Sequence, residues 1–195
     1  QTAFSILTEG GIDYSITYGN HDYTPGSPRN TELFNQYFPY ENFARQKSFG
    51  GAMEVGKSDN TYYCFTVNRI NYLVLSLEYN PSQETLDWAN NMVKSHPEYN
   101  VIVATHGYLD GKGGWLSPSD GGEGELIWNN LIKKHSNIFM VLCGHWSNND
   151  DPGSMTSRKD LGDNGNRVYQ YMVNSQDIDV ELGVTPLLIM RFFDG

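Results

Sequence analysis

Apolar residues along the chain alternate between strand-like and helix-like patterns. Continuous apolar runs at Asn100–Thr105 and Ile138–Cys143 are typical of strands that are covered on both faces. Thr61–Asn68 and Ile70–Tyr79 are rich in β-branched and aromatic residues, and the short break at Arg69 between them predicts a hairpin. These four segments therefore predict the centre of a β-sheet.

Three further segments predict strands nearer the ends of the chain. Ile12–Tyr18 alternates apolar and polar positions and runs into a polar loop, and Arg167–Asn174 and Thr185–Phe193 are also strand-like. The polar stretch from Asn148 to about Asn166 is expected to form a loop, and the Gly-rich passage Phe49–Gly56 is assigned neither a helix nor a strand.

Helix signals fall between the strand segments. Asn80-Pro81-Ser82 can open a helix, because Asn and Ser are good caps and Pro is tolerated in the first turn. The residues that share one face of this helix are Leu86, Ala89, Met92 and Val93. Thr31–Phe38 and Glu125–His135 predict two more helices. Strands that alternate with helices predict an α/β fold, a layered mixed sheet with flanking helices, in a single domain over residues 1–195.

Charge and composition exclude several functions. The 195 residues carry 13 Lys and Arg against 23 Asp and Glu, a net charge of −10, which argues against nucleic acid as a partner. No apolar run is long enough to cross a bilayer. Cys64 and Cys143 lie in apolar runs and are expected to be buried free thiols, with one disulfide as the alternative.

Three predicted strands end in residues that carry chemistry. Asn20-His21-Asp22, His106 and His145 each follow such a strand, and in open α/β sheets ligand sites gather at the carboxyl ends of strands. Imidazole nitrogens and an amide oxygen suit Zn, Mn or Fe. A metal or catalytic site is therefore one interpretation, and three unrelated loop histidines are the other. His96 and His135 fall in the last turns of predicted helices, where an imidazole is expected to be structural.

The order of these motifs resembles a known family. Gly19-Asn20-His21-Asp22, then Thr105-His106-Gly107, then Gly144-His145 look like the last three motifs of the calcineurin-like metallophosphoesterases. The resemblance implies a truncated αββα sandwich and a metal-dependent hydrolysis of phosphate monoesters or diesters, in which two ions bind phosphate and activate water. It further implies that Asn20, His106 and His145 ligate one metal, and that His21 is the catalytic acid with Asp22 as its orienting partner.

The chain departs from the family at two places. The family's N-terminal Asp-x-His and Gly-Asp-x-x-Asp motifs are absent from the 19 residues before Asn20. The last motif reads Gly144-His145-Trp146-Ser147 where the family has Gly-His-x-His. One metal site thus lacks its ligands, so we expect one occupied site or none, with Mn, Zn or Fe as the cofactor. Asp150 and Asp151 are candidates to compensate, although a solvated acidic loop is the favoured interpretation.

Two functions follow from the match and the departures. The chain is either a metallophosphoesterase of phosphorylated small molecules, or the C-terminal portion of one, weak or inactive on its own. The alternative is a degenerate member of the family that serves as a binding module. Strand edges and apolar faces left open by missing strands predict a homodimer or association with another segment. The acidic composition is compatible with an exported bacterial protein, but the compartment is left unassigned.

Overall fold

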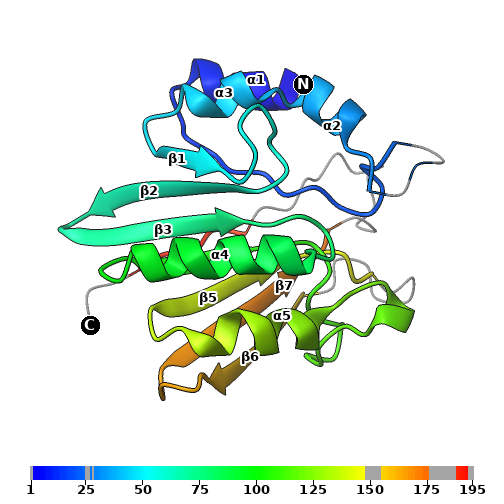
Figure 1. Cartoon of the computed structure of the whole chain (residues 1–195), viewed down its shortest axis with the longest axis vertical. Coiled ribbons are helices and arrows are strands. Elements are labelled where there is room, and N and C mark those ends of the chain that lie inside the picture. Colours follow the sequence, from blue (N-terminus) through cyan, green and yellow to red (C-terminus); the bar gives the residue numbers. More distant parts are fainter. Residues whose placement is uncertain (1, 25–26, 28, 148–154, 176–187, 193–195) are drawn as a thin grey trace.

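The computed structural model describes residues 2–24, 27, 29–147, 155–175 and 188–192, and its centre is a seven-stranded mixed sheet. The strands lie in the order β1-β2-β3-β4-β5-β7-β6 (Figure 1). Their bounds are β1 Phe49–Ala52, β2 Thr61–Val67, β3 Ile70–Ser76, β4 Asn100–Ala104, β5 Ile138–Cys143, β6 Met155–Leu161 and β7 Arg167–Val173. Strands β3, β4, β5 and β7 are parallel to one another, whereas β1, β2 and β6 run antiparallel to their neighbours.

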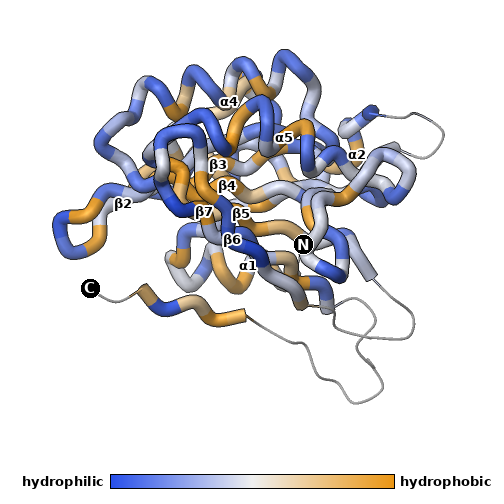
Figure 2. The backbone as a smooth tube through the Cα atoms, turned by 90° about the horizontal axis from the view of Figure 1, so that it is seen from below, coloured by the Kyte–Doolittle hydropathy of each residue, from blue (hydrophilic) through white to orange (hydrophobic). Residues whose placement is uncertain are grey.

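Helices cover one face of this sheet. The helices are α1 Thr2–Glu9, α2 Glu32–Tyr37, α3 Tyr40–Ala44, α4 Gln83–Ser95 and α5 Gly124–Asn130, with short 3₁₀ turns η1 Pro118–Asp120 and η2 Ile132–Lys134. Helices α4 and α5 lie side by side over the central strands, while α1, α2 and α3 gather beyond β1 (Figure 1). The segment 188–192 runs along the opposite side of the sheet (Figure 2). The prediction of a layered α/β fold with a mixed sheet is therefore confirmed.

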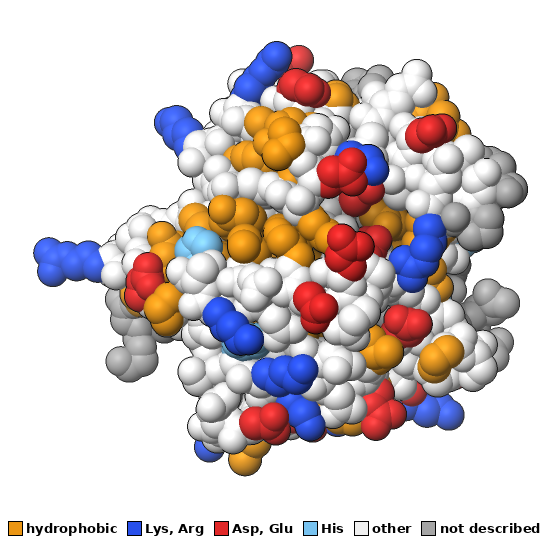
Figure 3. Space-filling model, viewed as in Figure 1, with side chains coloured by type: hydrophobic (Ala, Val, Ile, Leu, Met, Phe, Trp, Pro, Cys, Tyr) orange, Lys and Arg blue, Asp and Glu red, His pale blue; other side chains and the backbone are white. Residues whose placement is uncertain are grey.

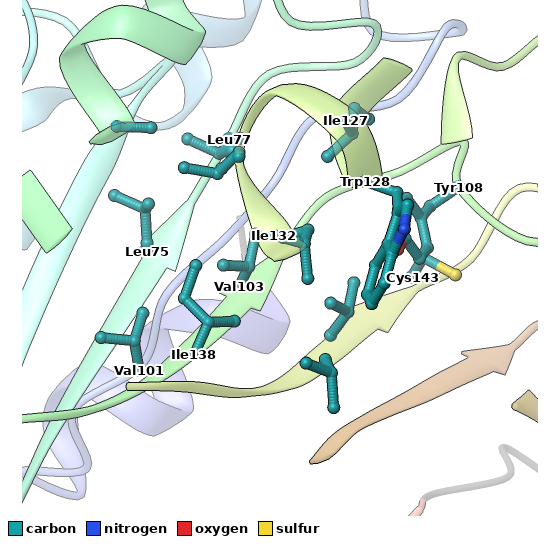
Figure 4. Packing of buried hydrophobic residues seen from close by; sticks show 14 of the residues in the cluster. Leu75, Leu77, Val101, Val103, Tyr108, Ile127, Trp128, Ile132, Ile138 and Cys143 are labelled. Atoms are coloured by element: carbon teal, nitrogen blue, oxygen red, sulfur yellow. The ribbon is translucent and has the colours of Figure 1, made fainter. Parts of the chain in front are cut away.

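The core lies between the sheet and the pair α4 and α5. Alternate residues of the parallel strands point to this side, among them Leu75, Val101, Val103 and Ile138, and all four are fully buried (Figure 4). Helix α4 packs the apolar face predicted for it, with Leu86, Ala89 and Val93 buried and Met92 packed at the edge. Strands β4 and β5 are buried on both faces of the sheet, which explains why each is a continuous apolar run.

Local sequence signals account for the hairpin and for the start of α4. Asn68 and Arg69 both have positive φ, as a two-residue turn that matches the twist of the strands requires. Ser82 caps α4, because its hydroxyl accepts a hydrogen bond of 3.1 Å from the backbone N–H of Thr85. Both predictions are confirmed.

The prediction of a strand at Ile12–Tyr18 is wrong. Within the described residues the segment belongs to no ladder: the Ile12 N–H donates to the carbonyl of Leu7 at 3.0 Å, and the Tyr14 N–H donates to Gln46 Oε1 at 2.7 Å. The Asp13 carboxylate in turn accepts the N–H of Ser48 at 2.8 Å. Polarity alternates here without a strand partner, so the pattern alone predicts the wrong element.

Two strands were not predicted. The start of the Gly-rich passage forms β1, and part of the polar stretch that was expected to be a loop forms β6. Strand β6 lacks an apolar face because Arg158 and Asp160, which point toward the helix side, satisfy each other in an ion pair of 2.7 Å. A strand at the edge of a sheet does not need apolar residues on either face, so the pattern of hydrophobic residues does not reveal it.

Some sequence predictions fall partly outside the described residues. Asp150 and Asp151 lie outside them, as do residues 185–187 and 193 of the predicted last strand, and residues 188–192 form no strand. Cys64 and Cys143 are free thiols, as expected, but only Cys143 is buried, whereas Cys64 is partly exposed. Within the described residues, no helix is both long and apolar enough to cross a bilayer.

Candidate functional site

The candidate residues meet at the carboxyl ends of the parallel strands. His106 follows β4 and His145 follows β5, and because β4 and β5 are parallel neighbours, both residues leave the sheet at the same edge. Asn20 reaches this edge from the extended segment 12–19. Tyr18 anchors that segment, since its ring is only 1% exposed and its hydroxyl donates to Glu78 Oε2 at 3.0 Å.

A tight turn presents Asn20 and His21. The backbone N–H of Asp22 donates to the carbonyl of Gly19 at 3.0 Å, and the Asp22 carboxylate accepts the N–H of Gly19 at 2.7 Å. Both ends of the turn are thereby closed by the same two residues. The two side chains between them are left free to point outward at the sheet edge.

Three donor atoms converge at this edge. His106 Nε2 lies 3.0 Å from Asn20 Oδ1 and 3.0 Å from His145 Nδ1, and the two rings meet edge to face at 4.8 Å between centroids. The structure therefore brings together the three residues that the sequence selects as metal ligands.

The backbone at His145 is strained in order to place its ring. Its φ is +71°, and the N–H of Trp146 donates to the carbonyl of Gly144 at 2.9 Å, which closes a γ-turn around His145. A non-glycine residue in this conformation costs free energy and persists where the surroundings enforce it. Such strain is typical of functional positions.

Two glycines give the imidazoles room. A Cβ at Gly19 would lie 2.7 Å from His106 Nε2, and a Cβ at Gly121 would lie 2.8 Å from His145 Nε2. Backbone therefore packs directly on both rings, and any side chain at these positions would displace them.

The surroundings keep both imidazoles neutral. Burial, followed by the nearby His145, lowers the pKa of His106 to about 4. Burial also lowers the pKa of His145, although a hydrogen bond from its ring to the Asp120 carbonyl opposes the shift. At neutral pH the ring nitrogens are consequently not both protonated, and lone pairs are available for a ligand.

A pocket of about 270 Å³ opens onto these groups. Its lining residues are Asn20, His21, His106, Asp120, His145, Trp146 and Ser147. Asp120 is the only acidic residue among them, and none is Lys or Arg. A larger hollow of about 780 Å³ lies between β5, β6, β7 and residues 188–192, but mostly apolar side chains line it. We therefore assign the chemistry to the smaller pocket.

Two distances within the donor set are compatible with ligands of one metal ion. Two donors that each lie about 2.1 Å from an ion, at right angles to each other, are about 3.0 Å apart, which is the separation found on both sides of His106 Nε2. Within the described residues, however, no group of three or more His, Cys, Asp and Glu side chains is placed to hold an ion. The site thus rests on two imidazoles and one amide oxygen.

The remaining sequence-selected residues divide between the pocket and its surroundings. His21 lines the pocket and is exposed. The hydrogen bond described for the Asp22 carboxylate goes to the Gly19 N–H rather than to His21. His96 Nδ1 bonds the Met92 carbonyl at 2.8 Å, and His135 Nε2 bonds Asn90 Oδ1 at 2.7 Å, so these two histidines serve the packing of α4.

Two residues of the site escaped the sequence analysis. Tyr79 stacks on His145 and lies edge-on to His106, and Asp120 lines the pocket from η1. Tyr79 follows β3, which is parallel to β4, so the rule that selected the other strand ends could have found it. No comparable signal marks Asp120, which lies in the Gly-rich loop.

The amino-acid sequence is similar to that of a bacterial protein. No protein-family model matches the chain. The uncharacterized protein YvnB of Bacillus subtilis (strain 168) is 29% identical over 183 residues, a match that covers 93% of this chain. The chain spans only 13% of the length of YvnB, which is a much longer protein.

Proposed function

We propose that this chain carries the acid and one metal site of a phosphoesterase that hydrolyses phosphate monoesters or diesters of small molecules. The observation that carries the proposal is the meeting of Asn20 Oδ1, His106 Nε2 and His145 Nδ1 at 3.0 Å spacings, beside a pocket that His21 lines. The motif order resembles that of the calcineurin-like metallophosphoesterases, and the proposal includes that resemblance.

The charge of the pocket supports a metal-dependent reaction. A phosphate ester is anionic, whereas the lining residues supply one carboxylate and no Lys or Arg. A divalent ion (Mn, Zn or Fe) would supply the positive charge that binds phosphate and stabilises charge in the transition state. Asn20, His106 and His145 would hold this ion.

His21 has the position of the acid. Its exposed ring lines the same pocket as the three donors, so a protonated His21 can give its proton to the leaving oxygen of the ester. Asp22 holds the Gly19 end of the turn and thereby sets where His21 points. In this account its orienting role acts through the backbone.

A binding module without catalysis is the second candidate. It is favoured by the absence of a carboxylate from the three-donor set and by Ser147 at the position where the family carries a second histidine. A single ion with three ligands can bind a phosphate group without activating water for attack.

Metal content and turnover separate the two candidates. The protein is purified without chelator, its metal is measured, and hydrolysis of 4-nitrophenyl phosphate and bis(4-nitrophenyl) phosphate is followed with added Mn²⁺. For a phosphoesterase, His21→Ala is expected to lower kcat by about 10²-fold or more, while His96→Ala, at the far end of α4, leaves it unchanged.

Other results would decide against one or both candidate functions. Turnover that survives His21→Ala comes from a contaminant and removes the catalytic proposal. Stoichiometric metal without turnover favours the binding module. A protein that takes up no metal contradicts both candidates.

A phosphorylated small molecule is the proposed ligand in either case. A homodimer, formed through exposed apolar residues on the sheet face opposite α4 and α5, is the proposed assembly. Met155 on this side of the sheet is 65% exposed, and exposed apolar surface of this kind favours association.

A further inference from the structure

Tyr79 contacts both imidazoles of the site and the loop that faces them. Its ring stacks on His145 at 5.8 Å and 28°, and it meets His106 edge to face at 5.6 Å and 73°. Its hydroxyl donates to the carbonyl of Gly121 at 2.8 Å. One side chain from the end of β3 thus joins the ends of β4 and β5 to the Gly-rich loop.

The loop segment that Tyr79 holds is the one that packs on His145. The ring nitrogen that faces this segment is Nε2, since a Cβ on Gly121 would lie 2.8 Å from it. The other ring nitrogen, Nδ1, lies 3.0 Å from His106 Nε2.

Tyr79 is itself held in place. The hydroxyl of Tyr23 donates to its carbonyl at 3.4 Å, and the rings of Tyr23 and Tyr79 lie 6.2 Å apart. A Cβ on Gly107 would lie 3.1 Å from Tyr79 Cε2, so the ring packs closely on the strand end that carries His106. Tyr79 is not among the residues that line the pocket.

We propose that Tyr79 is a positioning residue: by stacking on His145 and holding the Gly121 peptide beside its Nε2, it keeps the ring turned so that Nδ1 is offered to an ion. The inference rests on the proposed function, since the ion belongs to that proposal. Partners of this kind, one step away from a ligand, orient the ring and raise metal affinity.

The test uses Tyr79→Phe, which keeps the ring and removes the hydroxyl. In metal-free protein at fixed pH, ¹⁵N spectra of the histidine rings should show the signals of His145 shifted in the variant. The affinity for Co²⁺, read from its absorption bands, should fall by about 10- to 100-fold. The ring signals of His96 should keep their wild-type positions, which a general loosening of the fold does not predict.

Two companion variants complete the experiment. Tyr99→Phe, at the opposite end of β4, should match the wild type in both readouts. Gly121→Ala displaces the same peptide and should reproduce the shift of the His145 ring signals. Wild-type ring signals and Co²⁺ affinity in Tyr79→Phe would overturn the inference. A wild type that binds no Co²⁺ would instead overturn the proposed function, and the comparison of ring signals would still decide the role of Tyr79.

Discussion

At the scale of single residues, His145 is the position where local strain and the proposed ligand role coincide. Its φ of +71° is a conformation that glycine adopts without cost and other residues do not. We therefore predict that His145→Gly is more stable than His145→Ala by about 1 kcal/mol, because alanine keeps the strain and glycine removes it. Urea unfolding of the two variants measures the difference.

An exposed helical position provides the matched control. At Asn91 in α4 the order should reverse, since glycine in a helix interior costs about 1 kcal/mol relative to alanine. Equal stabilities of His145→Gly and His145→Ala, with the expected reversal at Asn91, would show that the γ-turn at His145 is not strained in solution.

His135 makes stability depend on pH. Burial, and then the positive charges of Lys94 and Lys134, lowers the pKa of its imidazole below the ordinary value of 6.5. The unfolded chain therefore binds more protons than the folded one just below pH 6.5, so the contribution of His135 is complete above that pH and is lost as the pH falls.

The expected result is a shallower pH dependence in His135→Gln. The free energy of unfolding of metal-free wild type should decline from pH 7 to pH 5, and the variant should decline less over the same range. Identical slopes for the two proteins would contradict the account of His135.

At the residue scale, the sequence predicts the three donors but not their surroundings. Asn20, His106 and His145 could be selected because each follows a strand-like segment, and parallel strands bring their carboxyl ends together. Asp120 and the bond from Asp22 to Gly19 could not be selected, since both depend on how a loop or turn closes on itself.

At the scale of elements, the Ser82 cap sets the start of helix α4. The Ser82 hydroxyl accepts the N–H of Thr85 at 3.1 Å, and Glu78 accepts the N–H of Ser82 at 3.0 Å. Ser82→Ala should lower the free energy of unfolding by about 1 kcal/mol, whereas Ser82→Asn, which preserves the cap, should lose much less. Equal losses in thermal or urea unfolding would assign the effect to something other than capping.

Element by element, burial decides which predictions succeed. The strands β2, β3, β4, β5 and β7 were predicted because apolar residues fill at least one of their faces. Strand β6 was missed because Arg158 and Asp160 form its inner face, and Ile12–Tyr18 was mistaken for a strand because its polarity alternates although it belongs to no described ladder. Hydrophobic patterning reports contact with a core and not hydrogen bonding to a neighbour.

At the scale of the whole molecule, the two faces of the sheet differ in how they are covered. Helices α4 and α5 cover one face, and on that side acidic and basic side chains are interspersed without a continuous basic surface (Figure 3). On the other face Met155, Tyr169 and Phe192 are exposed apolar residues. This asymmetry, together with the net charge of −10, suits a protein partner better than nucleic acid.

We predict a concentration-dependent dimer formed through the sheet face opposite α4 and α5. Sedimentation at micromolar concentrations should show self-association, and Tyr169→Lys should reduce it by placing a charge in the contact. Lys112→Glu, a charge change in the loop on the pocket side of the chain, serves as the control. A clean monomer for the wild type over this range would contradict the prediction.

We propose that three separate segments of the chain together form one metal site. The most direct measurement is anomalous diffraction from crystals grown with Mn²⁺. The account predicts a peak about 2.0–2.3 Å from each of Asn20 Oδ1, His106 Nε2 and His145 Nδ1, and loss of that peak in His106→Ala. An ion bound elsewhere, or no ion while the three side chains remain at their 3.0 Å spacings, would contradict it.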